Sequence, residues 1–77
     1  MPDWSQIQSF AAVAQHGSLS AAARAMGSSQ PTLSRHIAQL EADLGLRLFD
    51  RDQRGMVLTA RGADLLEHAQ AMADGPQ

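Results

Sequence analysis

Arginine is the side chain in this sequence with the clearest chemistry to offer. The chain has six basic residues, all of them arginine, and all lie between positions 24 and 61. Four carboxylates share that stretch, which leaves it a net charge of +2, whereas the remaining residues carry four carboxylates and no base, a net charge of −4. A guanidinium can form two hydrogen bonds with a phosphate or with the edge of guanine. Because local charge steers an anionic partner more than the total does, the middle of the chain is a candidate for contact with nucleic acid; an ordinary solvated surface is the alternative.

The segment 30–44 has helical spacing and one polar face without acids. Ser29 is placed to cap this helix and Gly45 to end it. Large apolar residues recur on one side, at Leu33, Ile37, Leu40 and Leu44. The other side carries small, basic or hydroxyl residues: Pro31, Arg35, Ala38 and Ala42, with Thr32 and Ser34 beside them. A helix that enters the DNA major groove needs donors in its N-terminal half and no anionic side chain on its outer face. The pattern therefore indicates a recognition helix.

Two further helices are expected before this one. Asp3, followed three residues later by a glutamine, has the spacing of a capping box, which predicts a first helix that Gly17 ends. Ser18 or Ser20 can cap a short second helix over residues 21–26. Helix, helix, short glycine-containing turn and helix are the order of a helix-turn-helix.

After the recognition helix the hydrophobic period changes. Apolar runs at 46–49 and 56–58 flank the polar segment 50–55, which predicts a β-hairpin. Thr59 then caps a fourth helix, which runs to residue 73. The fold class predicted is mostly α, a winged helix-turn-helix with a three-helix core, a short hairpin wing and a fourth helix. With 77 residues, we expect a single domain over 1–77.

Competing chemistry fails on composition and spacing. The chain has no cysteine, which excludes disulfides and thiolate metal sites. Ser34, His36 and Asp43 have the residue types of a hydrolytic triad, but the first two are two residues apart on one helix and point roughly 200° apart. The three histidines have no metal-binding spacing. We therefore expect no enzyme, no metal and no cofactor.

Membrane and export features are also missing from the sequence. No apolar run approaches the roughly 20 residues of a membrane span. The N-terminus has neither a basic start nor an apolar stretch. We expect a cytoplasmic protein with no membrane contact.

Several short motifs occur together along the chain. They are Ser29-Gln30-Pro31-Thr32-Leu33-Ser34-Arg35, Leu40-Glu41, Leu44-Gly45, Leu48-Phe49 with Arg51, and Leu58-Thr59. On these residues the sequence closely resembles the DNA-binding domain of LysR-type transcriptional regulators. The resemblance implies a bacterial, dimeric winged helix-turn-helix that binds half-sites of an imperfectly palindromic promoter. Members of the family normally continue into an effector-binding domain, which these 77 residues do not include, so no small-molecule effector is expected for this chain. Arg61 departs from the family, which usually has a small residue there.

The resemblance assigns DNA contacts to the recognition helix, about 30–44, in the major groove. The residues carried over are Ser29, Gln30, Pro31, Thr32, Ser34 and Arg35. Gln30 can pair with adenine, and Arg35 with guanine or a phosphate. Ser29 is expected mainly as a helix cap. The alternative for Arg35 is a surface ion pair with Glu41 or Asp43.

The wing, 50–58, is expected at the minor groove or the DNA backbone. Arg54 is next to Gly55 at the expected hairpin tip, where an arginine can enter a narrow, A·T-rich minor groove. Arg51 has two possible roles that the sequence leaves equal: the same contact, or an ion pair that holds the wing.

The fourth helix carries an apolar stripe, at Leu65, Leu66, Ala69, Met72 and Ala73. The stripe predicts either part of the domain's own core or a seam between two copies, and the helix 59–73 matches the start of the helix that pairs subunits in the family. A homodimer through this helix is therefore expected. The alternative function is a protein-interaction module that acts through mixed dimers with other regulators.

Overall fold

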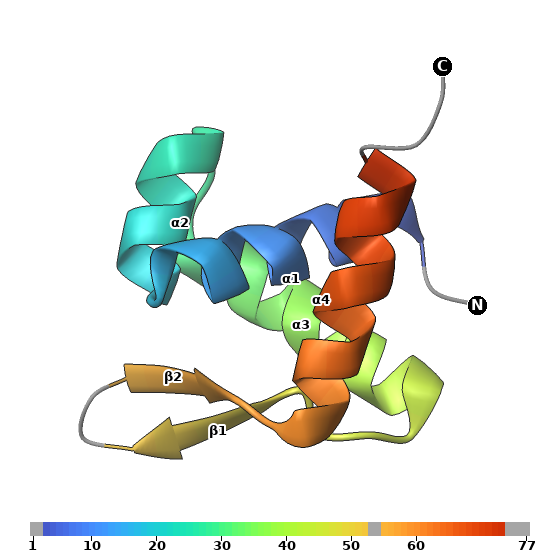
Figure 1. The fold of residues 1–77 in the computed structure, drawn as a ribbon. Helices are drawn as coiled ribbons and strands as arrows, with labels where there is room; N and C mark the ends of the chain where they lie inside the picture. The colour runs from blue at the N-terminus through green and yellow to red at the C-terminus, as the bar shows by residue number, and fades with distance from the viewer. Residues whose placement is uncertain (1–2, 53–54, 74–77) are drawn as a thin grey trace.

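The computed structural model describes residues 3–52 and 55–73, without the side chains of Arg51, Asp52 and Ala73. The elements follow the predicted order. They are α1 (Trp4–His16), α2 (Leu19–Met26), α3 (Gln30–Leu44), β1 (Phe49–Asp52), β2 (Gly55–Leu58) and α4 (Ala60–Ala73). Figure 1 shows α1 crossing the centre of the molecule, with α2 at one end and the hairpin below. In the same view α4 passes in front of α1. The predicted winged helix-turn-helix is confirmed.

Local capping explains where the first two helices begin. The Asp3 carboxylate accepts from the Ser5 backbone N–H at 2.7 Å, and the Gln6 side chain accepts from the Asp3 N–H, which completes the predicted capping box. At α2 the cap is Ser18, whose hydroxyl accepts from the Ala21 N–H at 3.1 Å. The helix therefore begins at Leu19, and the predicted start at residue 21 was wrong by two residues.

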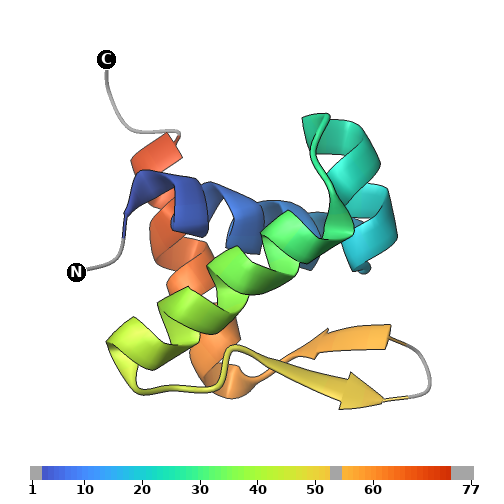
Figure 2. The same cartoon turned by 180° about the vertical axis from the view of Figure 1, so that it is seen from behind.

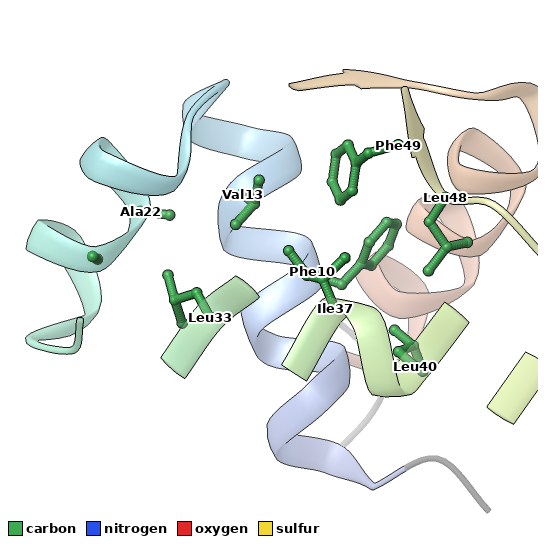
Figure 3. Close-up of a cluster of buried hydrophobic side chains, with 9 residues drawn as sticks. Phe10, Val13, Ala22, Leu33, Ile37, Leu40, Leu48 and Phe49 are labelled. Atoms are coloured by element: carbon green, nitrogen blue, oxygen red, sulfur yellow. The ribbon is translucent and has the colours of Figure 1, made fainter. Parts of the chain in front are cut away.

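The core lies between α1, α3 and the start of the hairpin (Figure 3). Its fully buried large side chains are Phe10, Val13, Leu33, Leu40 and Leu48. The ring of Phe10 packs on that of Phe49 with centroids 5.4 Å apart and planes at 53°, a tilted arrangement that aromatic pairs favour. The first strand of the wing is thus part of the core.

The hairpin pairs β1 with β2 in antiparallel register, from Phe49 opposite Leu58 to Asp52 opposite Gly55. Residues 50–52 are therefore strand, and their assignment to the turn was wrong. The first strand was predicted to begin within residues 46–48, and this was wrong as well, because β1 begins at Phe49. The N–H groups of Leu48 and Phe49, at the start of the strand, bond to a side chain of α3. Glu41 Oε2 accepts from Leu48 N–H at 2.7 Å and from Phe49 N–H at 3.3 Å.

The junction between the hairpin and α4 is tightly packed. Thr59 caps α4 as predicted, since its hydroxyl oxygen accepts from the Gly62 N–H at 3.0 Å. The same hydroxyl donates to the Arg47 carbonyl at 2.6 Å, and the Thr59 N–H donates to the Leu48 carbonyl at 3.0 Å. Gly62 is buried beside that carbonyl, and a Cβ at this position would lie 2.2 Å from the Leu48 oxygen. The first turn of α4 is therefore packed directly against the backbone of Leu48.

Candidate nucleic-acid interface

The N-terminal turn of α3 presents polar side chains outward. Gln30, Pro31 and Arg35 are exposed, and Thr32 and Ser34 are half-buried. Leu33 and Ile37 lie on the opposite side, in the core. The helix therefore has the two faces that its sequence pattern predicts, and no carboxylate lies in its first two turns.

Ser29 is the cap of α3, as predicted. Its hydroxyl oxygen accepts from the Thr32 N–H at 3.3 Å, and the hydroxyl donates to Thr32 Oγ1 at 2.9 Å. Both hydroxyls are thus engaged with one another while remaining at the surface. This leaves Gln30 and Arg35 as the long side chains at this end of the helix.

The start of α3 and the hairpin project toward the same side of the molecule (Figure 2). A groove of about 350 Å³ separates the helix from the hairpin, between Ser34 and Ala38 on α3 and Asp50 and Met56 on the strands. The helix and the wing therefore form one concave surface, in which Ser34 is shared between the helix face and the groove.

The charged residues of this groove are paired with groups of the chain itself. Arg47 Nε lies 3.5 Å from Asp50 Oδ1 in an exposed ion pair, a contact the sequence did not suggest. One carboxylate oxygen of Glu41 holds the two N–H groups at the start of β1. Among the described side chains Arg35 takes part in no ion pair, and the alternative of a bond to Glu41 or Asp43 is not what this structure contains.

Of the two wing arginines, the structure describes only the backbone of Arg51. The backbone of Arg51 lies in β1 opposite Met56. The side chain of Arg51 and the whole of Arg54 lie outside the described residues. Their roles at the minor groove or in holding the wing stay predictions.

The residue types that suggested a triad do not come together. His36 Nδ1 lies 2.7 Å from the hydroxyl oxygen of Ser9 on α1, rather than near Ser34. Ser9 is only 1% exposed, so no substrate can reach this serine–histidine pair. In the described part of the chain, no three histidine or carboxylate side chains gather as metal ligands. The Ser9–His36 contact spans 27 residues, and no local pattern could have revealed it.

The apolar stripe of α4 divides between the domain and its surface. Ala69 is 3% exposed, and Leu65 and Leu66 are half-buried against the core. Met72 is 55% exposed, and the side chain of Ala73 lies outside the described residues. The first turns of the stripe thus serve the domain's own core, and Met72 is the member that faces outward.

None of the described helices is long and apolar enough to cross a membrane.

Comparison with known proteins gives a consistent picture. Residues 4–63 match the model of the family described as bacterial regulatory helix-turn-helix proteins, lysR family. The chain is 49% identical, over 97% of its length, to a Pseudomonas SDS degradation transcriptional activation protein, and 46% identical, over 91%, to the transcriptional regulator ClcR of Pseudomonas putida. It spans about a quarter of the length of these relatives, 24% of each.

Two solved structures with DNA resemble the fold closely. The CbnR_DBD–DNA complex matches 94% of this chain and 83% of that one, with a TM-score of 0.88 and 42% identity. The complex of BenM_DBD with catB site 1 DNA matches 92% of this chain and 80% of that one, with a TM-score of 0.89 and 31% identity.

Proposed function

Because the chain belongs to the LysR family of bacterial regulatory helix-turn-helix proteins, we propose that it binds double-stranded DNA sequence-specifically and thereby regulates transcription. The observation that carries the proposal is the outer face of α3. Its N-terminal turns expose Gln30 and Arg35, hold no carboxylate, and lie beside a hairpin on the same side of the molecule. Such a surface has the shape and the donors that major-groove reading requires. A cytoplasmic location follows from the proposal, because bacterial DNA lies there.

In the proposed complex α3 enters the major groove by its N-terminal end. Gln30 pairs with adenine and Arg35 with guanine or a phosphate, whereas Pro31 and the Thr32 methyl group contact thymine methyl groups. Ser34 donates to a phosphate at the edge of the groove. Ser29 would do the same only by turning its hydroxyl proton away from Thr32 Oγ1, so its main role is the helix cap. Arg54, and Arg51 if its side chain is free, contact the minor groove or backbone beside the same half-site.

The proposed assembly is a homodimer on two half-sites of a promoter. The support is the outer side of α4, where Met72 is the exposed member of the apolar stripe. A dimer with two reading helices would bind half-sites one helical turn apart. The names of the relatives do not favour the alternative of a module that acts only through mixed dimers.

The test begins by enriching duplexes from a randomised pool with this chain. Affinity for the enriched duplex and for poly(dI-dC) is then measured by fluorescence anisotropy over a range of salt concentrations. Arg35→Ala is expected to weaken binding to the enriched duplex by about 1–3 kcal/mol, as for a lost bidentate base contact, and Gln30→Ala to relax preference at one position.

Arg61→Ala is the matched control, because Arg61 is an exposed arginine at the start of α4. It removes the same charge and should weaken binding to both DNAs by a similar, smaller factor. If Arg35→Ala also weakens both DNAs equally, Arg35 contacts only the backbone. If no duplex is enriched, sequence-specific binding is refuted.

A further inference from the structure

Two side-chain hydrogen bonds join α1 to the flank of α3. Ser9 Oγ lies 2.7 Å from Nδ1 of His36, and Gln6 Nε2 donates to Oε1 of Gln39 at 3.3 Å. The two bonds are one helical turn apart on each helix and run in antiparallel order. Ser9 is almost fully buried, and His36 is half-buried.

His36 occupies a position from which it can control the helix that reads DNA. It follows Arg35 directly and precedes the core residue Ile37. The apolar contacts of Leu33 and Ile37 hold α3 against α1, but such contacts are non-directional. A hydrogen bond weakens steeply with distance and angle, so the bond to Ser9 adds a directional restraint on the rotation and sliding of α3.

We propose that His36 is a positioning residue for DNA recognition: by bonding to Ser9 it fixes the rotation of α3 on α1, and with it the aim of Gln30 and Arg35. The inference rests on the proposed function, since it concerns the accuracy of base reading. Bidentate pairing with a base edge needs two atoms in place at once. A small rotation of α3 therefore weakens base contacts while contacts with the flexible, uniformly charged backbone persist.

The stability of the domain does not depend on a histidine at position 36. A serine hydroxyl inside a helix can donate to the carbonyl four residues earlier, so Ser9 could be satisfied within α1. Replacing both partners of such a bond by apolar groups of similar shape can leave stability almost unchanged. The bond across the helices adds direction to a contact that the core already stabilises.

Two amide substitutions distinguish the roles of the two ring nitrogens of His36. An asparagine side chain can bring a polar atom near the position of Nδ1, and a glutamine side chain reaches instead toward the position of Nε2. His36→Asn should therefore keep the bond to Ser9, and His36→Gln should lose it. Ser9→Ala removes the other partner, and the double variant with His36→Ala completes a double-mutant cycle.

The readout is the ratio of affinities for the enriched duplex and for poly(dI-dC), measured at 10 °C, with thermal unfolding recorded in parallel. We expect Ser9→Ala, His36→Ala and His36→Gln to lower the ratio about fivefold, the effect of one lost hydrogen bond. His36→Asn should stay within about twofold of the parent chain, and the double variant should lose no more than either single variant.

Other results would overturn the inference. If the variants unfold at lower temperature but keep the parent ratio, His36 is structural only. If losses in the double variant add, the two residues do not act as a pair. If the parent chain enriches no duplex, the proposed function fails and this inference with it, whereas an enriched duplex with unchanged ratios overturns this inference alone.

Discussion

Replacing Gly62 by alanine is expected to destabilise the domain, although alanine is the better helix former. In an open helix the change would stabilise by about 1 kcal/mol. Here the new Cβ would lie 2.2 Å from the Leu48 carbonyl oxygen and 2.7 Å from Cδ2 of Leu58, whereas ordinary contacts begin near 3.4 Å. The Leu48 carbonyl must therefore move by about 1 Å, and it is backbone that also accepts from the Thr59 N–H.

The size of the effect follows from three contributions. Overpacking of this kind costs about 1–3 kcal/mol, and a weakened backbone hydrogen bond adds about 1 kcal/mol. Subtracting the gain in helix propensity of about 1 kcal/mol leaves a net loss near 2 kcal/mol. For a domain of this size the melting temperature should fall by about 8–16 °C.

Thermal unfolding followed by circular dichroism at 222 nm measures the change. Ala63→Gly is the control, because Ala63 is exposed in the same turn of α4, and it reports the propensity difference alone, a loss of about 1 kcal/mol. A Gly62→Ala chain that melts at or above the parent temperature would refute the close packing of α4 on Leu48.

Two further predictions concern the wing and the fourth helix. Arg54→Ala should weaken binding to sites with flanking A·T tracts more than to G·C-flanked sites, because only the former have a narrow minor groove; equal losses in anisotropy titrations would indicate a plain phosphate contact. Met72→Asp should shift sedimentation toward monomer with helicity unchanged, because Met72 is exposed. Gln70→Asp adds the same charge to an exposed position roughly 200° around the helix and should leave the equilibrium unchanged; similar shifts for both would exclude a seam at Met72. Leu66→Asp is the poorer test, because Leu66 packs against the core and its loss would destabilise the domain.

Features set by neighbouring residues were predictable from the sequence. The caps at Asp3, Ser29 and Thr59 lie within three residues of the groups they bond, and the structure confirms each of them. The two faces of α3 followed from its period. The fold class followed from the order of these elements together with the motifs of the family.

Features set by distant residues were not predictable. The start of β1 depends on the Glu41 carboxylate, which takes the N–H groups of Leu48 and Phe49. The contact between Ser9 and His36 depends on how α1 crosses α3. The sequence of α4 could not show which members of its apolar stripe are buried. Apolar residues at helical spacing give the same pattern whether they pack against the core or face water.

The close contact at Gly62 is the point about which α4 would tilt relative to the hairpin. Met72 lies about 15 Å along the helix axis from Gly62, so a tilt of about 10° at the pivot would carry it about 3 Å sideways. That displacement is close to the spacing of one base pair along DNA, about 3.4 Å. Close packing at Gly62 opposes such a tilt. In the proposed dimer the two reading helices would then keep a constant separation, and a promoter with one base pair inserted between its half-sites would no longer fit both.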